Sequence, residues 1–217
     1  DVYKRQDFWF EFKKVVPKGF TRLFGKLAEL TDAGVKIYFF VGNHDAWMRN
    51  YFKKELGIDV FFEPKKFKIN SKKFFIGHGD GLGPGDYGYK FLKLIFRNSF
   101  FKFLFSCIHP DISIRIGEYL SRKNSVISGK EIKFESNEKE LLFNYCKKIL
   151  KYDHYNYFVF GHRHLPLKIN LGNNSQYYNC GDWFNHYSYL DFTNSELTLK
   201  YFNPEILSLI HISEPTR

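Results

Sequence analysis

The feature that most constrains this chain is a pattern that occurs three times along it. In residues 35–45, 73–80 and 157–164, an apolar run leads to a glycine and then to histidine, asparagine or aspartate. Short apolar runs rich in aromatic and β-branched residues predict buried strands. Because strand ends in an open α/β sheet converge on one crevice, we expect these polar side chains to lie close together. The sequence therefore predicts an α/β fold with a site at one sheet edge.

The last of these stretches places His162 and His164 directly after Gly161. A glycine allows a sharp turn, and two residues at i and i+2 of an extended segment point to one side. Imidazole is the commonest metal ligand in proteins, although two surface histidines in a polar loop would give the same pattern. Asn43 and His78, at the ends of the other two runs, favour the metal site.

The types of these side chains indicate which metal and which chemistry would suit them. An asparagine carbonyl, imidazoles and carboxylates suit Mn, Fe or Zn, and a pair of such ions can support in-line displacement at phosphorus. His44 is placed to protonate a leaving oxygen, or else it is a packing residue. Asp45 and Asp80 would orient ligating imidazoles, or else they cap turns.

The net charge and the aromatic content limit the classes of molecule that this protein is expected to bind. The formal net charge is +10, and aromatic residues make up 20% of the chain. A basic balance fits nucleic acid, an anionic membrane surface or a polyanionic substrate, or simply a solvated lysine-rich surface. Nucleic acid ranks last because the chain has no zinc finger and no aromatic-interleaved RNA motif. The aromatic excess, beyond what a core uses, suggests an apolar surface for a lipid-like partner.

The same composition favours a cytoplasmic location. The three cysteines, Cys107, Cys146 and Cys180, have no paired spacing, which favours reduced thiols. No apolar run reaches the ~18 residues of a membrane-spanning helix, and the first residues do not have the pattern of a signal peptide.

Residues 84–128 differ in character from the rest and are expected to form a helical insertion. The segment 87–105 is apolar nearly all round, and a further helix is expected to start near Pro110. The insertion is either an ordinary buried helix pair or a lid with an acyl-chain groove. Outside it, we expect helices over 21–33, ended by Gly34, and over 47–56, a helix opened by a capping box at 137–140, a hairpin over 67–76, and hairpins over 167–181 and 187–202 that complete a second sheet.

The three motifs together resemble the calcineurin-like metallophosphoesterase family: Gly42-Asn43-His44-Asp45, Gly77-His78-Gly79-Asp80 and Gly161-His162-Arg163-His164. Within it, the chain is similar to the branch that acts on UDP-2,3-diacylglucosamine in lipid A synthesis. That narrower similarity rests on the inserted helices and on Asp7-Phe8-Trp9-Phe10-Glu11 and Cys180-Gly181-Asp182-Trp183. It spans residues 7–202 and implies a four-layer α/β/β/α sandwich.

The resemblance also implies a dinuclear, usually manganese, centre. The residues that would hold one ion are Asn43, His78 and His162. His164 would hold the other ion, and His44 would be the catalytic histidine.

The implied reaction is hydrolysis of the pyrophosphate of UDP-2,3-diacylglucosamine to UMP and the acyl-sugar 1-phosphate. Asp86 and Arg122 would contact the substrate, and the insertion would shelter its acyl chains. The protein would act in the cytoplasm of a Gram-negative bacterium, peripherally on the anionic inner membrane.

The chain departs from this family at its start. The family opens with Asp-x-His and then Gly-Asp-x-x-Asp, whose first aspartate bridges both metals, and neither occurs here. Residues 1–6 and 209–217 look foreign, as in a truncated gene fragment missing the first strand. We therefore expect this chain to be inactive and its parent to be an enzyme. A phosphoesterase for soluble phosphodiesters or nucleotides, and a non-catalytic lipid- or membrane-binding module, remain the alternatives.

Overall fold

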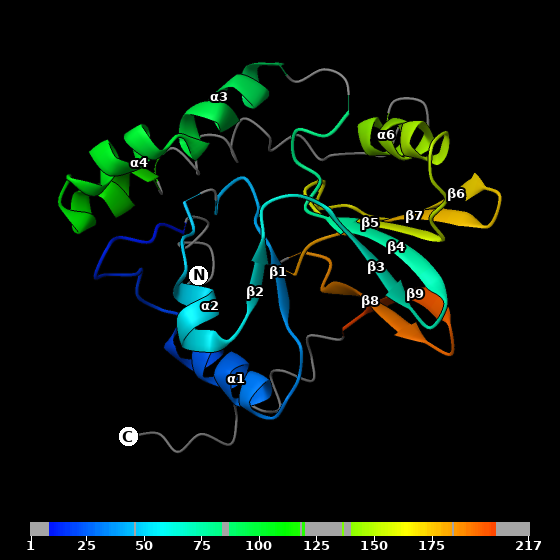
Figure 1. The fold of residues 1–217 in the computed structure, drawn as a ribbon, viewed down its shortest axis with the longest axis horizontal. Helices are drawn as coiled ribbons and strands as arrows, with labels where there is room; N and C mark the ends of the chain where they lie inside the picture. Colours follow the sequence, from blue (N-terminus) through cyan, green and yellow to red (C-terminus); the bar gives the residue numbers. More distant parts are fainter. Residues whose placement is uncertain are drawn as a thin grey trace. The chain divides into compact units, whose positions relative to one another are not determined.

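The computed structural model describes residues 9–45, 47–83, 87–117, 119, 136, 140–183 and 185–202 (Figure 1). The chain divides into two compact units, and neither is a continuous stretch of sequence. The first unit comprises residues 1–64 and 85–131, and the second comprises residues 65–84 and 132–217. The foreign-looking ends lie outside the described residues.

The second unit is built on a five-stranded mixed sheet with the order β3-β4-β5-β7-β6. Its central strands β4, β5 and β7 are parallel neighbours, and β3 and β6 pair antiparallel at the two edges. Parallel strands that run side by side end at the same edge of a sheet, so the segments that follow β4, β5 and β7 all begin at that edge. The mixed α/β fold predicted from the apolar runs is thus confirmed. The strands are β3 (Lys65–Ile69), β4 (Lys72–Gly77), β5 (Tyr157–Phe160), β6 (Pro166–Gly172) and β7 (Ser175–Cys180).

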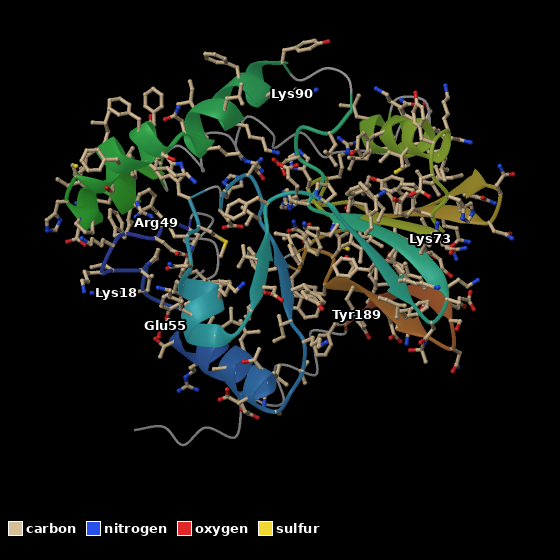
Figure 2. The ribbon with its side chains drawn as sticks, in the orientation of Figure 1. Lys18, Arg49, Glu55, Lys73, Lys90 and Tyr189 are labelled. Atoms are coloured by element: carbon tan, nitrogen blue, oxygen red, sulfur yellow. The ribbon has the colours of Figure 1, made fainter. Side chains whose placement is uncertain are left out.

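Each face of this sheet carries its own apolar core, and a different element covers each face (Figure 1). Helix α6 (Leu141–Leu150) covers one face, where Leu142 and Cys146 pack on Phe158 and Phe160. The hairpin of β8 (Ser188–Thr193) and β9 (Glu196–Tyr201) packs on the other face. Figure 2 labels Lys73 on β4 and Tyr189 on β8. The unit therefore has three layers: helix, sheet and hairpin.

The prediction that residues 167–181 and 187–202 complete one second sheet is wrong. Strand β7 enters the five-stranded sheet between β5 and β6, whereas β8 and β9 form a two-stranded sheet of their own. The reason is that Tyr177 and Tyr178, on opposite faces of β7, are both fully buried, and a strand buried on both faces belongs inside a sheet.

Two of the hairpins turn where the sequence indicated. Asn70 and Ser71 join β3 to β4 with φ of +45° and +63°, and Asn194 and Ser195 join β8 to β9 with φ of +53° and +64°. Positive φ at both central residues is the backbone of the tight hairpin turn that matches strand twist. Asparagine tolerates this conformation better than most residues, which explains its place in both turns.

The first unit contains a parallel strand pair and two helices around an aromatic core. Helix α1 (Thr21–Asp32) precedes β1 (Tyr38–Phe40), and α2 (Tyr51–Leu56) precedes β2 (Asp59–Phe61), which pairs with β1. Gly34 follows α1 with φ of +86°, as expected for a residue that ends a helix. Helix α2 is shorter than predicted, because Trp47 instead pairs with Phe10 in an isolated bridge.

The inserted segment forms α3 (Tyr87–Arg97), α4 (Ser99–Ser106) and a helical stretch over 110–117 in the first unit. Phe96, Phe105 and Ile114 pack against Phe10, Phe12 and Trp47. Helix α4 itself has no buried residue. Large side chains of the two helices are strongly exposed: Phe91 66%, Leu94 70%, Phe100 62% and Phe103 62%. An ordinary buried helix pair is therefore not what the structure shows.

Exposed apolar side chains, when they gather in one patch, usually mark a site for another molecule. Among the described helices, none is long and apolar enough to cross a bilayer.

Candidate functional site

Two of the predicted ligands meet where β4 and β5 end. The register pairs Gly77 with Phe160, so His78 and Gly161 are the next neighbours along the two strands. The Gly161 amide donates to the His78 carbonyl at 2.9 Å. The His78 and His162 rings lie with centroids 5.3 Å apart and planes at 66°. The fold therefore brings these two imidazoles together from positions far apart in sequence.

This pair of imidazoles fits a shared divalent ion. Two rings bound through nitrogens about 2.1 Å from one ion have centres roughly 4.5–6 Å apart. The observed separation of 5.3 Å falls in that range. Within the part of the chain that the structure describes, no three His, Cys, Asp or Glu side chains are arranged to hold a metal ion. That these two imidazoles are metal ligands stays a prediction, and a metal centre there would need further ligands.

The loop that carries the second imidazole is not extended, contrary to the sequence prediction. His162 and His164 have φ of +63° and +52°, while Gly161 is not left-handed. The sharp turn therefore lies at the histidines themselves and not at the glycine before them. A residue with a side chain in this conformation costs about 1–3 kcal/mol, and such strain concentrates at functional sites where the surroundings enforce it.

The neighbouring strand β7 adds a buried carboxylate, Asp182, to the same edge. Its Oδ1 accepts the backbone amides of Asn185 and His186. Its Oδ2 lies 3.1 Å from Nδ1 of His186 and 3.9 Å from Nδ1 of His164. A carboxylate on the Nδ1 side turns Nε2 away from it, which is how proteins orient imidazole ligands. In the structure the imidazole hydrogen bond of Asp182 goes to His186, and His164 lies just beyond hydrogen-bond distance of the same oxygen.

In the sequence, the motif that contains Asp182 served only for the family resemblance, and this residue was given no role in the site, although a signal for one was present. Gly181-Asp182 repeats the glycine-then-polar pattern of the other three motifs, and it does so at the end of β7. The run before it, Tyr177-Tyr178-Asn179-Cys180, contains a polar residue and so resembles a buried strand less clearly.

An ion pair between a buried carboxylate and a half-buried arginine lies beside the same loop. Glu140 directly precedes α6, its side chain is 1% exposed, and its Oε2 lies 3.2 Å from Nε of Arg163. Burial raises the pKa of the Cys146 thiol and of the Tyr177 hydroxyl, and the Glu140 charge raises both further. Residues 137–139 of the predicted capping box lie outside the described residues, and Glu140 makes no capping hydrogen bond with its side chain.

The remaining candidates follow β1 or lie elsewhere. Asn43, His44 and Asp45 form a turn in the first unit, where the Trp9 amide donates to the His44 carbonyl at 3.2 Å. Asp80 is buried in the second unit. That the residues of the two units share one metal centre stays a prediction, as do the roles of His44, Asp45 and Asp80. Asp86 and Arg122 lie outside the described residues.

Replacing Gly79 with alanine should disturb this site. Gly79 has φ of +111°, and an added Cβ would lie 3.2 Å from Cδ1 of Leu142 and 3.5 Å from Cβ of His162. We expect G79A to lower the free energy of unfolding by about 1–3 kcal/mol in urea titrations.

A second glycine provides the control for this substitution. Gly25 lies inside α1, where a Cβ would meet nothing within 4 Å. Because alanine favours helix over glycine, G25A should stabilise by about 0.5–1 kcal/mol. Equal effects at the two sites would contradict the assignment of strain at Gly79.

Comparison with known proteins gives the family. No family model matches the chain. It is 34% identical to a UDP-2,3-diacylglucosamine hydrolase of Porphyromonas gingivalis over 208 residues, covering 89% of this chain and 79% of that protein. Hydrolases of the same name from Pseudomonas syringae pv. tomato and Wigglesworthia glossinidia brevipalpis are 26% and 29% identical, with 85% and 80% of this chain covered and 75% and 68% of those proteins. The chain therefore belongs to the UDP-2,3-diacylglucosamine hydrolase family.

Proposed function

We propose that this protein, in a form that carries the family's opening motifs, hydrolyses the pyrophosphate bond of UDP-2,3-diacylglucosamine to acyl-sugar 1-phosphate and UMP in lipid A synthesis. The observation that carries the proposal is the His78–His162 pair at the ends of two parallel strands, with ring centroids 5.3 Å apart. Relatives named for hydrolysis of the same substrate support it. The fold we propose is the four-layer sandwich of metallophosphoesterases, spanning residues 7–202.

The residues we propose to hold two Mn²⁺ ions are Asn43, His78 and His162 for one ion and His164 for the other. Bound there, the ions would supply charge stabilisation at the pyrophosphate oxygens and a water of lowered pKa. His44 would deliver a proton to the leaving oxygen. Asp182 would hold the Nδ1 side of His164, since its carboxylate is buried and faces that nitrogen.

The lipid part of the substrate is supported by the exposed apolar side chains of α3 and α4. Acyl chains buried against such a surface would gain about 0.8 kcal/mol per methylene group. Asp86 and Arg122 are proposed as substrate contacts, by resemblance. The net charge of +10 would favour a peripheral position on an anionic cytoplasmic membrane surface.

The test compares two forms of the protein on two substrates with Mn²⁺ present. The printed 217 residues contain neither Asp-x-His nor Gly-Asp-x-x-Asp. We expect this form to release no UMP from UDP-2,3-diacylglucosamine, and a form that also carries those motifs to release it. Mn²⁺-dependent UMP release by the shorter form would refute its inactivity.

Two further outcomes distinguish the alternatives. Turnover of bis-p-nitrophenyl phosphate but not of the lipid by the longer form would indicate a phosphoesterase for soluble substrates. Binding to anionic vesicles without turnover or bound metal would indicate a non-catalytic module.

A further inference from the structure

We propose that Glu140 is a positioning residue for the histidine loop: by pairing with Arg163, it fixes the residues on either side, His162 and His164. The role in metal binding rests on the proposed function, whereas the structural part concerns the loop alone. All of the groups involved belong to the second unit.

The first support is that the loop needs to be held. Its two histidines are left-handed, at φ +63° and +52°, a conformation that persists only where neighbouring groups enforce it. The Arg163 amide donates to the Gly161 carbonyl at 2.7 Å, which closes the turn on itself. The side chain between the histidines, Arg163, reaches the buried Glu140.

The second support is that the other side of the loop is already fixed. The Gly161 amide is bound to the His78 carbonyl at 2.9 Å, and its carbonyl accepts from the side chain of Asn179, a fully buried residue. These contacts fix the start of the loop at β4 and β7. The ion pair with Glu140, at the start of α6, fixes Arg163 in the middle of the loop. The turn is therefore held by groups at the ends of β4, β7 and α6.

The third support is the cost of the carboxylate where it lies. Glu140 is 2% exposed and lies among Cys146 and Tyr177, and its Oε1 has no hydrogen-bond partner among the described residues. The Nε–H of Arg163 is not aligned as a hydrogen bond, so the contact at 3.2 Å is an ion pair. A buried carboxylate whose hydrogen bonds are so incompletely satisfied adds little stability compared with apolar packing. A specific conformation of the loop is a better reason for the ion pair.

The experiment compares the chain with E140Q, R163Q and the double variant. Amide hydrogen exchange at residues 161–164 reports the loop without any metal. Titration with Mn²⁺, followed by electron paramagnetic resonance, reports the imidazoles. Each single variant should speed exchange of the Arg163 amide at least about 10-fold and weaken Mn²⁺ binding about 10–100-fold, as for other groups that orient ligands. The double variant should lose no more than either single variant, because one interaction is removed in all three.

Asp153 supplies the matched control, because it lies just past the other end of α6. Its carboxylate contacts Lys66, Lys73 and Tyr155, and these groups lower its pKa to about 2, the Tyr155 hydrogen bond most. D153N should lower stability without changing exchange at 161–164 or Mn²⁺ affinity.

Three results would overturn the proposal. One is unchanged loop exchange in both E140Q and R163Q. Another is exchange that rises equally in the loop and in β5 and β7, which would show a general loss of stability. The third is unchanged Mn²⁺ affinity with a loosened loop. If E140Q does not fold, R163Q decides, since Arg163 is 34% exposed. If the unsubstituted chain binds no Mn²⁺, the exchange data still decide the structural part, and the titration is repeated on a form that carries the family's opening motifs. If that form binds no Mn²⁺ either, the proposed function fails.

Discussion

Replacing His162 with alanine is expected to weaken Mn²⁺ binding by at least about 100-fold, more than the loss of a group that only orients a ligand. The substitution removes one imidazole of the pair whose ring centroids lie 5.3 Å apart. His78→Ala should have a similar effect, and the double variant should add little, because one ligand alone does not hold the ion. Titration with Mn²⁺, followed by electron paramagnetic resonance, measures all three.

The control for these substitutions is His109→Ala. His109 follows α4 in the first unit, and its side chain is 67% exposed. Its loss should leave Mn²⁺ affinity unchanged, and thermal unfolding should show that every variant is folded. If H162A and H109A bind Mn²⁺ equally well, the strand-end pair does not hold a metal.

The second large effect is expected at Phe158, in the middle of the second unit. Phe158 is 0% exposed on β5 and contacts the rings of Phe75 and Tyr155 at centroid distances of 5.8 Å and 5.4 Å. Phe158→Ala should lower the free energy of unfolding by about 3–5 kcal/mol, because it removes a large buried side chain and leaves a cavity. That is a large part of the about 5–15 kcal/mol that a native protein has.

Urea titration followed by far-ultraviolet circular dichroism measures this loss. Tyr152→Ala is the matched control, since Tyr152 is an aromatic residue just after α6 that is 84% exposed. It should change the free energy of unfolding by no more than about 0.5 kcal/mol. A cost below about 1 kcal/mol for F158A would mean that β5 is not the centre of this core.

Local sequence patterns predicted most of the second unit. Apolar runs ending in Gly77 and Gly161 became the buried parallel strands β4 and β5, because such runs pack well only inside a sheet. The Asn70-Ser71 turn was predictable because asparagine tolerates positive φ. His78 and His162 were predicted to meet for the same reason: both follow strands that end at one edge.

Contacts between segments far apart in sequence were not predictable in this way. Nothing local indicates that Glu140 pairs with Arg163 and not with the backbone of its own helix. The left-handed backbone of His162 is imposed by the surrounding fold, because the residue type does not favour it. Asp182 joins the site because β7 enters the sheet beside β5, and the choice of neighbouring strand is a property of the whole sheet.

The alternation of the two units along the chain has a consequence for synthesis on the ribosome. The polypeptide passes from one unit to the other three times, at residues 64–65, 84–85 and 131–132. Strands β3 and β4 leave the ribosome well before β5 and β7. Because the ribosome adds about 5–20 residues per second, β3 and β4 wait several seconds for the strands they pair with. During that interval the nascent hairpin has its apolar side chains uncovered, and it is then that a chaperone would have most to protect.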